Sequence, residues 1–251
     1  MCHSDDSRPP GPPVVGPVGE HGRVDVVSAD GTRVSAYYAL PEGTPRAGVV
    51  VLPDVRGLHP YYMALTERLA EVGLAAVAID FYVRTAGPAV DGSRDESFAW
   101  QSHREQTTTT QIDDDTAAGI DFLRARTRAG LPVISMGFCF GGSNAWRQSA
   151  SAIDLDGCVG FYGQAAAVGE AATRAAKPTL MIIAGADHIT SAQSQVALAD
   201  TMRAAGAEVT VVVYEGAPHS FFDRHFAEWA DASADAWTHV LALVDRVTAS
   251  A

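Results

Sequence analysis

The chain has 251 residues, which suits one α/β domain with or without a short tail, and its hydrophobic content of 47% is enough for a sizeable core. The formal net charge of −12 argues against nucleic acid and anionic membranes as partners, because both reward Lys/Arg clusters and none is present. No stretch reaches the roughly 18 apolar residues of a membrane span, and the first twenty residues lack the apolar core of a signal peptide.

The cysteine content is low and odd. Cys2, Cys139 and Cys158 do not suggest a disulfide framework. They fit a reducing compartment, so we expect a cytoplasmic protein with room for one reactive thiol. The sequence leaves open whether the protein is a monomer or a homodimer.

Residues 1–20, rich in Pro, Gly and polar residues, are predicted to form a flexible N-terminal tail, which leaves residues 21–251 as a single domain. Two β-like runs follow, at 23–29 and 32–40. Asp30-Gly31 lies between them and predicts an antiparallel hairpin.

Beyond the hairpin, apolar runs alternate with stretches of helical periodicity. The runs are apolar throughout, as strands covered on both faces are. They lie at 48–53, 74–81, 132–138, 157–163, 179–186 and 209–215. Helical stripes occupy most gaps between them, beginning with Tyr62, Leu65, Leu69 and Val72. This alternation predicts the α/β class, with a mostly parallel central sheet flanked by helices.

One biased stretch, four threonines at 107–110, precedes Gln111 and the acidic run 113–115. An acidic metal or partner site is conceivable there. We favour a helix capped by Thr110, with the carboxylates in its first turn against the positive end of the helix dipole.

The sharpest functional signal is the run GFCFGG at 137–142, which follows an apolar strand and precedes a helix-compatible segment. This is the strand–turn–helix context of a nucleophile elbow. The turn is tight, so the small residues Gly137 and Gly141 flank Cys139 two positions away on each side. At the head of a helix, the dipole favours thiolate over thiol. The alternative is a small buried cysteine before a Gly-rich helix start.

Two further residues fit the order nucleophile, acid, histidine that this fold uses. Asp187 and His219 each follow an apolar run, at the carboxyl ends of predicted strands where open α/β sheets bind their ligands. Cys139 would attack, His219 would move the proton, and Asp187 would fix the imidazole tautomer. The alternative for Asp187 is a loop or helix cap, and His225 is the rival base.

At this point the chain resembles a known family. The segments that carry the resemblance are VVLPDVRGL, GLAAVAIDFYVR, GFCFGG, GFYG, AGADH and YEGAPHSF. Together they resemble the dienelactone hydrolases (carboxymethylenebutenolidases) of the α/β-hydrolase superfamily. The resemblance implies an α/β-hydrolase fold without a large lid domain, and a cysteine nucleophile that opens an enol-lactone without metal or organic cofactor. It places the family's triad on Cys139, Asp187 and His219.

The same resemblance implies roles for residues around the thiol. It places the oxyanion hole on the backbone N–H groups of Val55 and Phe140. The family's thiol-contacting glutamate falls on Asp54, one methylene shorter, so a thiol contact and a loop cap are both open for this residue. Tyr162 aligns with a family tyrosine near the site, with a core aromatic as the equal alternative.

The family substrate carries a carboxylate held by arginines, and here the match is incomplete. Arg84 matches one of the arginines. The second position is Asp223, with Arg224 one residue further on, and Arg56 beside the oxyanion loop is a possible substitute. For each arginine the alternative is a surface salt bridge.

These features predict a hydrolase of small carboxylic esters or lactones, with a small-molecule substrate and a thioester acyl-enzyme. The altered arginine positions leave open neutral aryl esters or phosphate triesters as substrates. A non-catalytic ligand-binding α/β domain is a third hypothesis, which no sequence feature favours. We expect the long segment 85–110 to edge the site.

Overall fold

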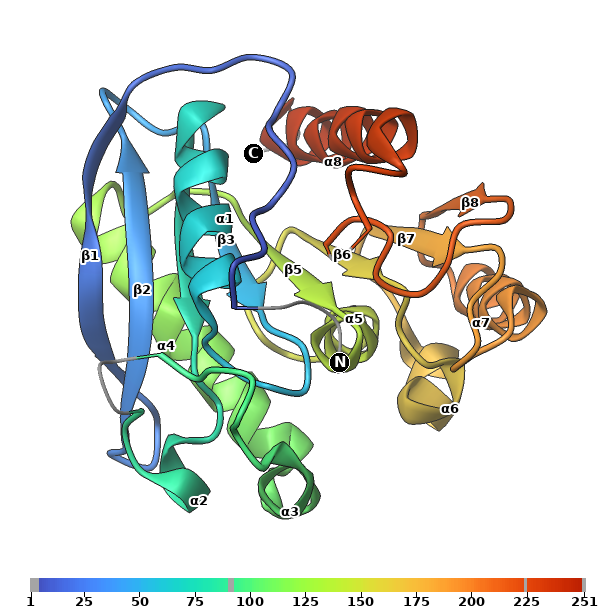
Figure 1. Ribbon diagram of the computed structural model, residues 1–251, viewed down its shortest axis with the longest axis horizontal. Helices are drawn as coiled ribbons and strands as arrows, with labels where there is room; N and C mark the ends of the chain where they lie inside the picture. Colours follow the sequence, from blue (N-terminus) through green and yellow to red (C-terminus); the bar gives the residue numbers. More distant parts are fainter. Residues whose placement is uncertain (1–4, 90–92, 224, 250–251) are drawn as a thin grey trace.

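The computed structural model describes residues 5–89, 93–223 and 225–249. Its centre is one eight-stranded sheet with the order β1-β2-β4-β3-β5-β6-β7-β8 (Figure 1). The strands are β1 (Val18–Val27), β2 (Arg33–Pro41), β3 (Ala47–Leu52), β4 (Leu74–Ile79), β5 (Val133–Phe138), β6 (Gly157–Phe161), β7 (Thr179–Ala184) and β8 (Val209–Tyr214). The β1–β2 and β2–β4 pairs are antiparallel and the other pairs are parallel, so the predicted fold class and hairpin are confirmed.

The central strands are covered on both faces, which explains why they are apolar throughout. Successive residues of β3 point into different cores: Val49 and Val51 join α1 and α8, whereas Val50 and Leu52 join α4. The helices are α1 (Pro60–Glu71), α2 (Val83–Ala86), α3 (Trp100–Gln106), α4 (Thr109–Arg126), α5 (Phe140–Gln148), α6 (Ala165–Val168), α7 (Ala192–Ala204) and α8 (Ala230–Ala249). A 3₁₀ helix, Gly169–Arg174, follows α6.

The start of α4 corrects one expectation. Thr108 is its N-cap, not Thr110, because the Thr108 hydroxyl accepts the Gln111 N–H and the Gln111 side chain accepts the Thr108 N–H. These two bonds form a reciprocal capping box, which explains why Thr108 is the N-cap of α4. The acidic run is used for ion pairs: Asp113 meets Arg147 and Asp115 meets Arg84.

The N-terminal segment also differs from the expectation of a flexible tail over residues 1–20. β1 begins at Val18, and residues 5–17 pack on the domain. The Trp237 indole N–H donates to the Pro10 carbonyl at 3.2 Å, and the Gly16 N–H donates to the Glu71 carbonyl at 2.7 Å. Residues 1–4 lie outside the described part of the chain. Among the described residues, no helix has both the length and the apolar content to cross a membrane.

Candidate active site

Cys139 occupies a sharp turn between β5 and α5. Its φ is 51° and its ψ −108°, a conformation that costs on the order of 1–3 kcal/mol for a residue with a side chain. A Cβ on Gly137 would lie 2.0 Å from the Gly141 carbonyl oxygen, and one on Gly141 would lie 2.0 Å from the Leu52 carbonyl oxygen. Both flanking positions therefore require glycine, as the elbow pattern predicted.

Backbone strain gathers at this edge of the sheet. Among the described residues, three non-glycine residues have positive φ: Cys139, Tyr162 (38°) and Ser220 (68°). They follow β5, β6 and β8 respectively. Strained backbone of this kind persists where the surrounding structure fixes it, and it clusters at functional sites.

Asp187 and His219 form a direct pair. The Asp187 Oδ2 and His219 Nδ1 atoms are 2.7 Å apart, and the two side chains are 0% and 3% exposed. The Asp187 Oδ1 accepts the Ile189 N–H at 2.8 Å. The Ala186 N–H donates to the Ala217 carbonyl at 2.9 Å, which ties together the loops that carry the acid and the base. With Asp187 Oδ2 as the acceptor of the Nδ1–H, the ring lone pair of His219 is on Nε2.

Tyr162 links the cysteine turn to the histidine. The Cys139 N–H donates to the Phe161 carbonyl at 3.0 Å, and the ring of the next residue, Tyr162, lies 4.9 Å from the His219 imidazole. The Tyr162 hydroxyl donates to Asp223 Oδ2 at 2.7 Å. Burial, with the charge of Asp223 next, raises the pKa of Tyr162 well above its ordinary value, so this hydroxyl stays protonated. The structure thus brings Tyr162 to the site.

The loop after β3 lies across from the elbow. No described residue accepts a hydrogen bond from the Val55 or Phe140 N–H, so both remain available to an oxyanion. Asp54 is fully buried, and its Oδ1 accepts the Arg56 N–H at 2.9 Å, which is the loop-capping role. The Asp54 N–H donates to the Tyr62 hydroxyl at 3.1 Å. A contact between Asp54 and the thiol stays a prediction.

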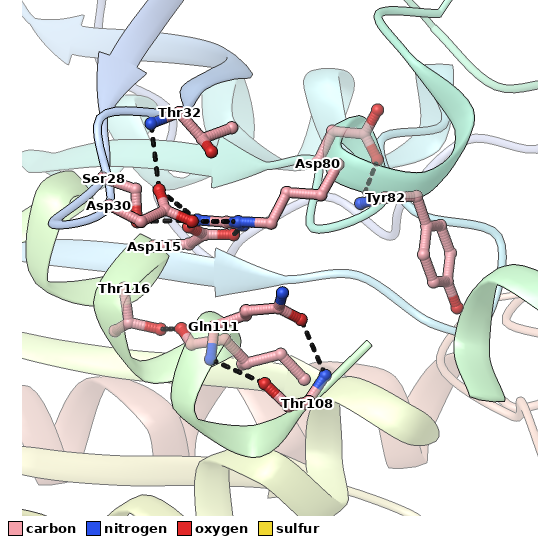
Figure 2. Close-up of polar contacts among 11 residues, drawn as sticks. Ser28, Asp30, Thr32, Asp80, Tyr82, Thr108, Gln111, Asp115 and Thr116 are labelled. Atoms are coloured by element: carbon pink, nitrogen blue, oxygen red, sulfur yellow. Dashed lines mark hydrogen bonds and ion pairs between the residues drawn. The ribbon is translucent and has the colours of Figure 1, made fainter. Parts of the chain in front are cut away.

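Arg84 is paired within the protein, and a substrate-binding role for it stays a prediction. Its guanidinium donates to both oxygens of Asp30 at 2.7 and 3.1 Å, to both oxygens of Asp115 at 2.8 Å each, and to the Ser28 hydroxyl at 2.9 Å. Figure 2 shows the Asp30 and Asp115 side chains close together, near Ser28. All three guanidinium nitrogens therefore donate to partners within the protein.

The second of the two positions at which the family's carboxylate-binding arginines were expected has no arginine in the described chain. Asp223 is 1% exposed and bonded to Tyr162, while Arg224 lies outside the described residues. Arg56 is fully buried. Its positive charge is one cause, after burial, of a His59 pKa lowered to about 3.

The segment 85–110 contacts the site in a way that the sequence did not predict. The segment contains α3, and the Arg104 guanidinium carbon lies 5.3 Å from the centre of the Phe140 ring, next to the nucleophile. The Tyr82 hydroxyl donates to the Val55 carbonyl at 2.8 Å. The Tyr82 ring packs on Phe98, with centroids 5.5 Å apart. Aromatic residues within a polar stretch were the available signal. The expectation that this segment edges the site agrees with these contacts.

Among the described residues, no group of three or more His, Cys, Asp or Glu side chains is arranged to hold a metal ion.

Comparison with known proteins settles the family. The sequence model of the Dienelactone hydrolase family matches residues 34–248. The chain belongs to this family. A candidate carboxymethylenebutenolidase of Saccharolobus solfataricus is 27% identical over 257 residues, which cover 88% of this chain and 96% of that protein.

Solved structures agree with the family. A candidate dienelactone hydrolase of Klebsiella pneumoniae has a TM-score of 0.76 at 25% identity and covers 90% of this chain and 98% of its own. A promiscuous phosphotriesterase that resembles dienelactone hydrolases, from metagenomic libraries, has a TM-score of 0.71 at 25% identity and covers 91% of this chain and 99% of its own. This dienelactone hydrolase family member is therefore an ester-hydrolysing enzyme with the α/β-hydrolase fold, as the sequence predicted.

Proposed function

We propose that this enzyme hydrolyses small carboxylic esters or lactones through a Cys139–His219–Asp187 triad. The observation that carries the proposal is the 2.7 Å Asp187–His219 pair, whose imidazole contacts Tyr162, the residue after the carbonyl that accepts the Cys139 N–H. A buried carboxylate on Nδ1 holds the imidazole in the tautomer that can accept a proton at Nε2. Cys139 is the N-cap residue of α5, directly before its first residue, Phe140.

The reaction then runs in two halves. His219 Nε2 removes the thiol proton, and the Cys139 sulfur attacks the ester carbonyl carbon. The Val55 and Phe140 N–H groups stabilise the tetrahedral oxyanion, and losing one such donor costs about 3 kcal/mol in related chemistry. The C–O bond breaks, His219 protonates the leaving oxygen, and a thioester forms on Cys139. Water, deprotonated by His219, cleaves the thioester to release the acid and the thiol. In a lactone, the leaving oxygen stays on the acyl group.

A second substrate class has support of its own. The two positions expected to hold carboxylate-binding arginines offer none to a substrate. Arg84 is paired with Asp30 and Asp115, and the other position is Asp223. A solved structure with the same fold is described as a promiscuous phosphotriesterase. Neutral aryl esters or phosphate triesters are therefore the alternative substrates.

The test is hydrolysis of dienelactone, p-nitrophenyl acetate and a p-nitrophenyl phosphate triester by wild type and Cys139→Ala. We expect turnover of at least one substrate by wild type and none by the variant. The fastest substrate selects between the two classes. Wild type that is inert to all three, with a Cys139 unreactive towards iodoacetamide, would contradict the proposal and revive the ligand-binding alternative.

The setting of the reaction is part of the proposal. We infer a reducing compartment such as the cytoplasm, because a thiolate nucleophile must escape oxidation. Cys139 and Cys158, the two cysteines in the described part of the chain, form no disulfide. A monomer or a homodimer is expected, with a small-molecule substrate.

A further inference from the structure

Arg104 is a cation at the edge of the proposed site, and it has no counter-ion among the described residues. It is half-buried on α3, and its Nε is buried without a hydrogen-bond partner. No hydrogen bond or ion pair joins its guanidinium to any residue that the structure describes. In a chain with a net charge of −12, a half-buried arginine without a carboxylate is unusual.

The neighbouring arginines behave differently. Arg94 pairs with Asp80 at 2.9 Å, Arg84 pairs with Asp30 and Asp115, and Arg147 makes a bidentate pair with Asp113. Their charges are therefore committed within the protein. The guanidinium donors of Arg104 have no acceptor in the described part of the chain, so they can bind a group from outside it.

The position of Arg104 is defined by aromatic contacts. Its guanidinium lies over the ring of Phe140, the residue whose N–H is a proposed oxyanion donor. Burial, followed by the charge of Asp54, raises the pKa of Tyr82, and the charge of Arg104 opposes this rise while that of Cys139 adds to it. Arg104 and the thiol of Cys139 thus act on the same hydroxyl.

The residues next to Arg104 are held in place by contacts with the central sheet. His103, the preceding residue of α3, stacks on Phe98 with ring centroids 5.2 Å apart and an interplanar angle of 11°. Phe98 in turn lies under Arg94, whose guanidinium carbon is 4.4 Å from the ring centre. Arg94 is bound to Asp80 at the end of β4. These contacts hold Arg104 in place before a ligand arrives, which lowers the entropy cost of binding.

We propose that Arg104 binds a carboxylate on the acyl part of the substrate, and so makes the enzyme select anionic over neutral esters. A guanidinium matches a planar carboxylate through two parallel N–H···O bonds, and a half-buried site strengthens them. This recognition comes from α3 and from neither of the two positions at which the family's arginines were expected. The inference rests on the proposed ester hydrolysis.

The experiment compares p-nitrophenyl acetate with mono-p-nitrophenyl glutarate, whose acyl group ends in a carboxylate. Arg104→Gln should lower kcat/KM for the glutarate ester about 10- to 100-fold, the effect of a lost hydrogen bond to a charged group. Its kcat/KM for the acetate should stay within about 3-fold, which also shows that the variant folds. Arg104→Lys should be intermediate, because it keeps the charge and loses the fork.

Arg128→Gln is the matched control. Arg128 is exposed, donates to the Gly130 carbonyl, and its loss changes the net charge by the same amount. It should leave both esters unaffected. Wild type that hydrolyses both esters, with Arg104→Gln lowering both equally or neither, overturns this inference alone. Wild type that is inert towards both overturns the proposed function and the inference with it.

Discussion

Two regions of this enzyme hold charged side chains in opposite ways. The proposed catalytic edge comprises Cys139, Tyr162, Ser220, Asp187 and His219. The first three have positive φ, the last two form a buried pair, and the Val55 and Phe140 N–H groups have no acceptor within the described chain. In the Arg84 cluster, defined as Ser28, Asp30, Arg84 and Asp115, all three guanidinium nitrogens donate to partners within the protein, and none of the four residues has a positive φ (Figure 2).

This difference predicts which property a substitution in each region will change, catalysis or stability. The catalytic edge holds strain and unsatisfied donors in a geometry that suits a transition state, at a cost in folding free energy. The Arg84 cluster joins the hairpin turn to α4 through hydrogen bonds from all three guanidinium nitrogens, so it contributes to folding. A substitution at the catalytic edge should change kcat, whereas one in the cluster should change the free energy of unfolding.

The largest effect is expected at the catalytic edge. Asp187→Asn removes the charge that fixes the His219 tautomer, and we expect kcat for p-nitrophenyl acetate to fall about 10³- to 10⁴-fold. The measurement is steady-state kinetics on the purified variant. Asp200→Asn on α7 is the control, since Asp200 is 67% exposed and paired only with Arg203 among described residues. Activity within tenfold of wild type would remove Asp187 from the triad.

In the Arg84 cluster, the response should appear in stability. Asp115→Ala leaves the Arg84 charge, 11% exposed, without its buried partner, and we expect a loss of about 3–5 kcal/mol in the free energy of unfolding. The kcat of the folded variant should match wild type. Urea unfolding and kinetics at 25 °C measure the two quantities.

The control for this variant is Asp154→Ala. Asp154 is 82% exposed and pairs with Arg124, so its loss should cost less than about 1 kcal/mol. If Asp115→Ala instead abolished activity at unchanged stability, the Arg84 cluster would have to act on the substrate.

As the pH falls, the free energy of unfolding should first decrease through His59, in the loop after β3. Burial and the charge of Arg56 lower the pKa of His59 to about 3, compared with about 6.5 in the unfolded chain. Between these values the unfolded chain binds a proton that the folded chain does not, so stability falls as the pH decreases from about 6.5 towards 3. The slope should reach about 1 kcal/mol per pH unit.

Urea unfolding at pH 7 and pH 5 measures this slope. His59→Asn should flatten it, because an asparagine oxygen can still accept the Tyr61 N–H that His59 Nδ1 accepts at 3.0 Å. His239→Asn on α8 is the control. The Arg84 cluster should not contribute in this range: Arg84 lowers the pKa of Asp30, so the stability from that carboxylate is lost only below about pH 4. Equal slopes in wild type and His59→Asn would contradict the assignment.

The sequence predicted what depends on local pattern and chain order. Apolar runs marked the strands, and the order of Cys139, Asp187 and His219 marked candidates that the sheet topology then brought to one edge. It could not predict the role of Arg84, whose partners Asp30 and Asp115 lie 54 and 31 residues away.

The N-terminal segment and α3 were missed for a related reason. Proline-rich residues 5–17 have no periodicity, and they pack through single contacts such as the Trp237 N–H to the Pro10 carbonyl, 227 residues apart. The helix α3 has seven residues, none of them buried, so it shows no apolar stripe. In both segments tertiary contacts, not local propensity, fix the backbone.

The smallest predicted effect tests backbone strain at the nucleophile directly. Glycine adopts the φ of 51° at Cys139 freely, so Cys139→Gly should relieve backbone strain of about 1–2 kcal/mol that Cys139→Ala keeps. Glycine also costs about 0.5–1 kcal/mol through the entropy of the unfolded chain. Because the relief is the larger effect, Cys139→Gly should be roughly 0.5–1 kcal/mol more stable than Cys139→Ala. At Cys158, buried in β6 and without a positive φ, the order should reverse. Urea unfolding of the four variants decides. The same order at both positions would mean that the turn at Cys139 holds no strain, and the contrast between the catalytic edge and the Arg84 cluster would then rest on their hydrogen bonding alone.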